Sequence, residues 1–176
     1  MDVIATITEK IQKLQDLGKP SAEKQAIINV SEVFYVWDVM VMKMDILHTV
    51  RIMESLIVDS DLRFIAVQLR KGLETGISQM ERIMKDYSIP FPLRPPAAST
   101  AISTLEDFSD KIIYETLYEG IQSFFFVLAS GYMNSTSPQV RKALKEHLLL
   151  TMQLQELIVE YGKIKGYLNV PPVYRA

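Results

Sequence analysis

The sequence predicts an all-α protein, a four-helix bundle with a long crossover between its second and third bundle helices and a short helix at the N-terminus. Three observations support this prediction. Apolar residues recur at helical spacing through four long stretches of the chain. A proline-rich segment, residues 88–103, separates the second stretch from the third. The 176 residues are 48% hydrophobic, which suffices for one substantial core.

Composition and charge exclude several classes of function. The net charge is −2 and Lys and Arg form no patch, so we expect no nucleic-acid partner. The chain has no cysteine, which excludes disulfides, thiolate metal sites and cysteine nucleophiles. The N-terminus lacks the basic start and apolar run of a secretory signal. Because the longest apolar run, near residues 124–129, is far too short to span a bilayer, we expect a soluble, cytoplasmic protein with no membrane partner.

Residues 1–20 are predicted to form a short amphipathic helix and a linker, with the bundle occupying residues 21–176. Gly18 and Pro20 close this helix. Its apolar stripe must pack on the bundle or on another chain, and consists of Val3, Ile4, Ile7, Ile11, Leu14 and Leu17.

The first long helix is predicted to be apolar on two sides. Asn29 and Glu32 have the spacing of a capping box, so the helix should begin there, although Ser21 could begin an earlier turn. One stripe is Val33, Val36, Met40 and Leu47; the other is Val30, Phe34, Trp37, Val41 and Met44. A helix apolar on two sides is usually covered on two sides. We expect one side to face the core and the other to face the N-terminal helix or a second subunit.

The second long helix should begin after a break at residues 59–61 and run to about Tyr87. Its predicted core stripe is Leu62, Ile65, Leu69, Leu73, Met80, Ile83 and Tyr87. Gly72 and Gly76 lie four residues apart within it. A glycine costs a helix interior about 1 kcal/mol relative to alanine, so the pair favours a close helix approach, with simple tolerance as the alternative.

The segment 88–103 determines the topology. It contains Pro90, Pro92, Pro95 and Pro96, which favour an extended path. At about 3.1 Å per residue its sixteen residues reach roughly 50 Å, whereas a thirty-residue helix is about 45 Å long. The connection can therefore run the length of the bundle, so that the second and third helices point the same way. One such crossover is typical of ferritin-like bundles.

The third long helix should begin near Thr104 or Ser109 and end around Asn134. Its core stripe is Ile113, Leu117, Ile121, Phe124 and Leu128. The fourth should begin with Ser137 as its cap and Pro138 at its first position, and end at Gly166. Its core residues are Val140, Leu144, Leu148, Leu154 and Ile158. The tail, 169–174, cannot continue a helix and is expected to lie against the bundle.

Ferritin-like metal sites use carboxylates from four helices and two Glu-x-x-His pairs. This chain has two histidines and one related pair, Asp45 and His48. At 1.5 Å per residue, His48 lies about 28 Å along the first long helix. Glu119 and Glu156 reach the same height on the third and fourth helices, and Gly72 leaves room beside them. Asp45, His48, Glu119 and Glu156 are thus the candidate metal ligands.

These four residues, at one height in the bundle, have two interpretations. They could bind iron, manganese or zinc, or they could be a layer of polar side chains without a ligand. Helix phase favours the second, because Glu115, Glu119 and Gln122 lie outside the main apolar face. We therefore expect no cofactor. His147 has no acidic residue three positions before it, and we expect it to be partly buried and hydrogen-bonded. No motif for a catalytic residue or a phosphate-binding loop is present.

Scattered motifs resemble an uncharacterised family of ferritin-like proteins from endospore-forming bacteria, similar to spore coat protein F. They cover residues 29–174 and are Asn29-x-x-Glu32, Trp37, Asp59-Ser60-Asp61-Leu62-Arg63, Ile89-Pro90-Phe91-Pro92, Phe108-Ser109-Asp110-Lys111, Gly166-Tyr167-Leu168 and Pro171-Pro172. The resemblance implies a ferritin-like bundle and a link to sporulation or the spore coat. It implies no catalytic residue, and Gly76 or a neighbour stands where a ferritin-like site would have histidine.

The leading hypothesis is a non-catalytic bundle that acts by association, as a homo-oligomer or with another protein. It rests on the two apolar sides of the first long helix and on the amphipathic N-terminal helix. The alternative is a metal-binding redox or storage protein that uses Asp45, His48, Glu119 and Glu156.

Overall fold

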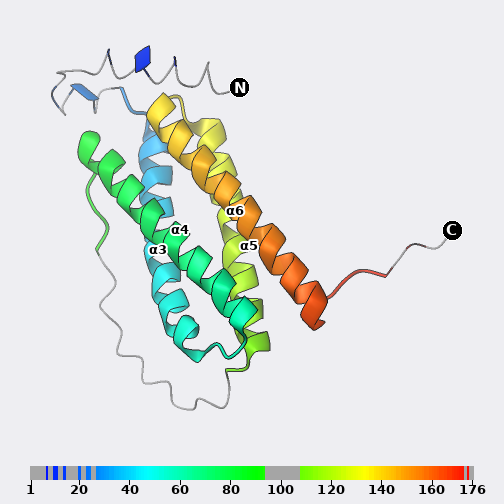
Figure 1. Cartoon of the computed structure of the whole chain (residues 1–176). Helices are drawn as coiled ribbons and strands as arrows, with labels where there is room; N and C mark the ends of the chain where they lie inside the picture. The colour runs from blue at the N-terminus through cyan, green and yellow to red at the C-terminus, as the bar shows by residue number, and fades with distance from the viewer. Residues whose placement is uncertain are drawn as a thin grey trace.

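Four long helices form one bundle in the computed structural model (Figure 1). They are α3, Val30–Leu56; α4, Ser60–Asp86; α5, Asp110–Asn134; and α6, Pro138–Lys165. The structure describes residues 27–93, 108–172 and 174, together with residues 7, 10, 11, 14, 20, 23 and 24. The predicted all-α four-helix bundle is confirmed.

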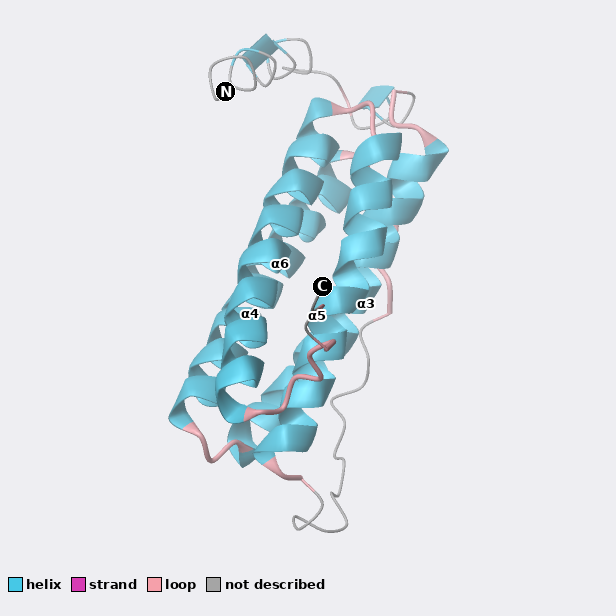
Figure 2. Cartoon of the chain, turned by 90° about the vertical axis from the view of Figure 1, so that its right-hand side faces the viewer, coloured by secondary structure: helices cyan, strands magenta, loops and turns pink. Residues whose placement is uncertain are grey.

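The order and direction of the helices match the predicted crossover. Neighbouring helices are α3 with α4, α5 with α6, α3 with α5, and α4 with α6, while α4 and α5 lie across the diagonal. The carboxylate of Asp110, at the start of α5, accepts hydrogen bonds from Val58 N and Asp59 N in the α3–α4 turn. Helix α5 therefore begins at the end where α4 begins, and the two run in the same direction, as the colours of Figure 1 show; Figure 2 shows the same four helices side by side after a quarter turn. The connection between them must return along the whole bundle.

The helix boundaries follow the capping residues expected from the sequence. Asn29 and Glu32 form the capping box of α3, and Asp59 accepts hydrogen bonds from the amides of Asp61 and Leu62 at the start of α4. Of the two predicted starts for the third helix, Ser109 is correct. Gly166 ends α6 with φ of 69°, a left-handed conformation that glycine adopts without strain.

The cap of α6 differs from the expectation in one respect. Ser137 occupies the N-cap position and Pro138 follows it, but the Ser137 side chain makes no capping hydrogen bond. Its hydroxyl lies 3.0 Å from the buried hydroxyl of Tyr87 at the end of α4 instead. The Ser137 side chain thus links α6 to α4, and the backbone amide of Ser137 donates to a residue of another helix.

That residue is Glu32, whose carboxylate is fully buried and serves two helices. One oxygen accepts from the backbone amide of Asn29 at 3.0 Å, and the other from that of Ser137 at 2.5 Å. Helices α3 and α6 both begin here, so the carboxylate stabilises two helix N-termini at once. The opposite end has a matching arrangement in Asp110, and Lys165 Nζ lies 2.6 Å from Asp59.

The core consists of the stripes predicted for α4 and α5, whose members are all buried. In α6 the prediction is correct except for Leu148, which is only partly buried. In α3 the core face carries Val36, Met40 and Leu47. A Cβ added to Gly72 would lie 2.8 Å from Cδ2 of the Leu150 side chain of α6, so this glycine leaves room for that side chain, while a closer approach of the helices themselves stays a prediction.

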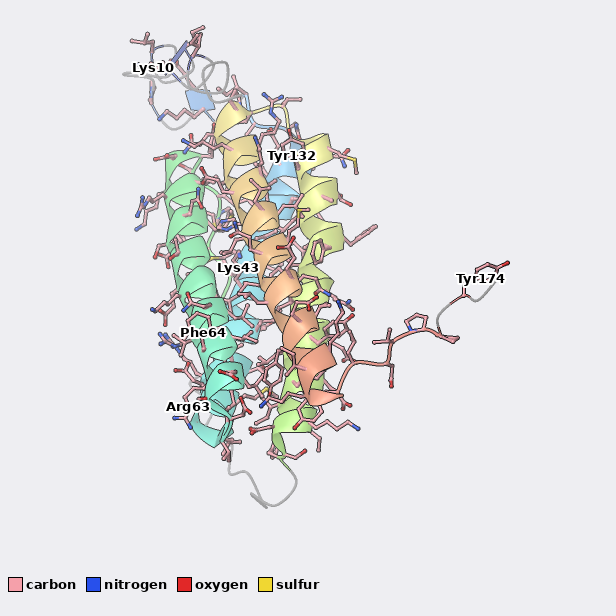
Figure 3. The ribbon with its side chains drawn as sticks, turned by 45° about the vertical axis from the view of Figure 1, so that its right-hand side comes forward. Lys10, Lys43, Arg63, Phe64, Tyr132 and Tyr174 are labelled. Atoms are coloured by element: carbon pink, nitrogen blue, oxygen red, sulfur yellow. The ribbon has the colours of Figure 1, made fainter. Side chains whose placement is uncertain are left out.

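Two terminal predictions have different outcomes. The N-terminal helix, 1–20, lies mostly outside the described residues; Ile7, Lys10, Ile11 and Leu14 are helical and exposed, and the boundary at residue 20 stays a prediction. The expectation that the tail packs on the bundle is wrong for residues 169–172 and for Tyr174, which is 90% exposed (Figure 3). Tyr167 is the last aromatic residue before them that packs on the bundle, against Tyr114 and Tyr161.

Replacing Glu32 by alanine should strongly destabilise the fold. The change leaves the buried amide of Ser137 and the partly buried amide of Asn29 without acceptors, and hydrogen bonds to a charged group contribute about 1.5–3 kcal/mol each. We expect the free energy of unfolding, measured with urea, to fall by roughly 3 kcal/mol. Glu119→Ala, on an exposed position of α5, is the control and should change it by less than about 0.5 kcal/mol. Equal effects of the two changes would contradict the bridging role of Glu32.

A pair of glycine variants tests the packing of α5 against α6. A Cβ at Gly162 would lie 2.0 Å from the hydroxyl of the buried Tyr114, whereas one at Gly120 would meet nothing within 4 Å. Gly162→Ala should therefore lower the free energy of unfolding by about 1–3 kcal/mol through overpacking. Gly120→Ala should raise it by up to about 1 kcal/mol, because alanine is the better helix former. Calorimetry of both variants would refute this account if Gly162→Ala were neutral.

Candidate functional site

The four predicted metal ligands are not brought together. Asp45, Glu119 and Glu156 are exposed and His48 is partly exposed. Among the described residues, no group of three His, Asp or Glu side chains could hold a metal ion. The structure thus gives no support to this site, and metal binding by Asp45, His48, Glu119 and Glu156 stays a prediction.

Helix phase explains why a shared height does not become a shared site. His48 follows Val30 by eighteen residues, which is five full turns, so both point in the same direction. Val30 is 86% exposed, and this direction leads away from the bundle. On α5, Glu119 lies seven residues before Phe126, which is 82% exposed. The heights estimated from the sequence placed these residues along the axis but not around it.

A different polar pair occupies the centre of the bundle. Lys43 of α3 and His147 of α6 are only 4% and 5% exposed. Both reach the space left by Gly76 of α4: a Cβ there would lie 2.9 Å from Lys43 Nζ and 3.0 Å from His147 Cε1. From α5, the Phe124 ring has its centre 4.8 Å from Lys43 Nζ, a cation–π distance. All four helices therefore contribute to this layer, and Figure 3 shows Lys43 between them.

Burial makes both bases weaker. Desolvation lowers the pKa of Lys43 to about 8, because the charged ammonium loses its water. The pKa of His147 falls to about 3 through burial and, secondly, through the nearby charge of Lys43. Within the described part of the chain, no carboxylate pairs with Lys43, and His147 Nε2 has no hydrogen-bond partner. His147 is thus a neutral imidazole at physiological pH, more deeply buried than expected and without the expected bond at Nε2.

The donor set of this layer does not suit a metal ion. Iron, manganese and zinc sites in helical bundles use several carboxylates with imidazole. Here one imidazole faces an amine that carries a positive charge below pH about 8, and that charge repels a cation. Lys43 was not among the residues predicted for a site. Its signal was a single charged residue three positions after Met40 and four before Leu47, both on the predicted core stripe.

The Lys43–His147 pair should govern the pH dependence of stability. A lysine in the unfolded chain has a pKa of 10.5, whereas the pKa of folded Lys43 is about 8, so stability should rise with pH between these values, by about 3 kcal/mol. Unfolded histidine binds a proton from pH 6.5 downward and folded His147 only near 3, so stability should fall as the pH is lowered over that range. The measurement is the free energy of unfolding in urea as a function of pH. Lys43→Met should remove the rise in stability between pH 8 and 10.5, the alkaline limb of this curve. His147→Gln should remove the fall in stability below pH 6.5, its acid limb. The exposed control Lys145→Met should leave the alkaline limb unchanged; the same flattening in that variant would contradict the assignment.

The outward side of α3 is apolar and exposed. We define the outer face of α3 as Val30, Phe34, Trp37, Val41 and Met44. The first three are 86%, 55% and 41% exposed, and the last two are partly exposed. This is the second stripe expected from the sequence; Val30, Phe34 and Trp37 face away from the core, whereas Met44 also packs against it. An exposed apolar stripe of this length marks an interaction site more often than a solvated surface.

An open groove of about 580 Å³ lies between α3 and α4 and is lined by Arg51, Glu54, Ser55, Arg63, Arg70 and Glu74. Its charges are largely engaged with one another. Arg70 pairs with Glu54 at 2.7 Å and with Glu74 at 3.3 Å, and Arg51 pairs with Glu74 at 3.0 Å. The Arg51 hydrogen bond is the main cause that lowers the pKa of Glu74. This network holds α3 against α4, and we assign it no ligand.

Comparison with known proteins supports the fold. No model of a protein family matches the chain, and no curated protein matches its sequence. The structure is similar to the crystal structure of a protein from Bacillus halodurans C-125 that is provisionally described as a spore coat protein, with a TM-score of 0.75 and 18% sequence identity. The match covers 85% of this chain and 96% of that protein. At this identity the likeness establishes the helical-bundle fold alone.

None of the helices in the described part of the chain is long and apolar enough to cross a membrane.

Proposed function

We propose that this protein is a non-catalytic structural protein that acts by association through the outer face of α3, in a role related to the spore coat. The exposed apolar side of α3 is the observation that carries the proposal. The bundle core alone buries the opposite side of this helix, so the outer face serves no purpose within the four-helix unit. Covering Phe34 and Trp37 in an interface would remove the exposed apolar area from water.

The spore-coat part of the proposal is supported by the structural neighbour from Bacillus halodurans and by the motifs shared with the family similar to spore coat protein F. The burial of Lys43 and His147, which are 4% and 5% exposed, supports the non-catalytic part, since neither base is accessible to a substrate from outside the bundle. A metal-binding role for Asp45, His48, Glu119 and Glu156 is the alternative proposal. Iron, manganese or zinc at stoichiometric level in protein purified without chelators would favour that alternative.

Two matched phenylalanine variants test the association. Phe34 on the outer face of α3 is 55% exposed, and Phe64 on α4 is 56% exposed. Burying one Phe side chain contributes about 1.5–3 kcal/mol, so Phe34→Ser should weaken self-association at least about tenfold in light scattering at micromolar concentration. Phe64→Ser should leave it unchanged. A wild-type protein that stays monomeric throughout this range, or equal effects of the two variants, would contradict the proposal.

A further inference from the structure

A second apolar surface exists in this chain besides the outer face of α3. The N-terminal stripe includes Ile7, Ile11 and Leu14, which are helical and are 51%, 51% and 72% exposed. Each surface is apolar, and the described residues leave most of it uncovered. Two such surfaces in one chain can cover each other.

The charges beside the two surfaces are complementary. Within residues 30–50 the charged side chains other than buried Glu32 and Lys43 are Asp38 and Asp45. At 100° per residue, both lie on the same flank of the outer face of α3. Two α3 helices packed on each other through this face would bring Asp38 and Asp45 of both copies to the contact, alongside His48. The outer face therefore fits a partner with basic flanks better than it fits a second α3.

The N-terminal segment has such a flank. Lys10 is exposed and lies beside the stripe formed by Ile7 and Ile11. The lengths are compatible. From Ile7 to Leu14 a helix extends about 11 Å, and from Val30 to Met44 about 21 Å. The apolar residues Ile7, Ile11 and Leu14 can thus all lie on the outer face of α3.

We infer that the N-terminal segment of a second copy of this chain docks on the outer face of α3, so that two copies exchange these segments in a symmetric dimer. The inference rests on the proposed function and names its partner. Within one copy both surfaces remain exposed, whereas a reciprocal exchange covers both surfaces of both copies and closes with two-fold symmetry. Lys10 of one copy then lies beside Asp38 and Asp45 of the other.

Because the chain has no cysteine, single introduced cysteines report the contact directly. Full-length Ile11→Cys and Val41→Cys proteins, one carrying a size tag, are mixed and oxidised. We expect a mixed disulfide between the two variants as the main product, and no homodimer of Val41→Cys. Glu119→Cys, on an exposed position of α5, replaces Val41→Cys in the control and should give at least tenfold less mixed product. A doubly substituted chain should form crosslinks between copies.

The other outcomes overturn the inference. A Val41→Cys homodimer would mean that two α3 helices pair, and a crosslink confined to one chain in the double variant would mean that the segment docks on its own bundle.

Substitutions on the two surfaces test the same contact by its strength. Full-length Ile7→Ser should weaken dimerisation at least tenfold, and Lys10→Glu should weaken it about two- to fivefold. Mixing Lys10→Glu with Asp45→Lys should restore dimerisation. If Ile7→Ser dimerises normally while Phe34→Ser does not, the inference fails and the proposed function stands.

Discussion

Parallel helices on each diagonal set the main electrostatic constraint on this bundle. Because α3 and α6 both begin at one end and α4 and α5 both begin at the other, each end gathers two positive helix N-termini. Glu32 serves the first pair by accepting from the amides of Asn29 and Ser137. Asp110 stabilises the other pair: it lies in the first turn of α5, and its carboxylate accepts from the amides of Val58 and Asp59 just before α4. The same two carboxylates that satisfy the backbone therefore also hold the two hairpins in register.

Local signals predicted the elements, and a length comparison predicted their arrangement. Asn29, Asp59, Ser109 and Gly166 mark helix ends by backbone chemistry that operates within a few residues, so the sequence alone reveals them. The crossover followed from the reach of residues 88–103 compared with a helix length. Ser137 occupies the N-cap position as expected, but its hydroxyl lies beside that of Tyr87 and its amide donates to Glu32, 105 residues away. No local pattern contains such a partner.

The candidate metal layer illustrates the other limit of sequence reasoning. Height along a bundle needs only a residue count. The direction in which a side chain points around its helix depends on which other helices pack against each face. Here His48 points outward with Val30, while Lys43 points inward. A single lysine within an apolar run is usually assumed to extend its amine to solvent. Gly76 removes the atoms that would prevent Lys43 from entering the core, and a pairing between residues of different helices is not visible in one sequence.

The long return between α4 and α5 also bears on how the chain folds. Contacts within the α3–α4 pair and within the α5–α6 pair join residues close in sequence, and such contacts form quickly. Contacts between the pairs require closure of a much longer loop, although the entropy of closing a loop grows only slowly with its length. Each hairpin can therefore assemble before the two meet, and the hydrogen bonds of Glu32 and Asp110 then join them.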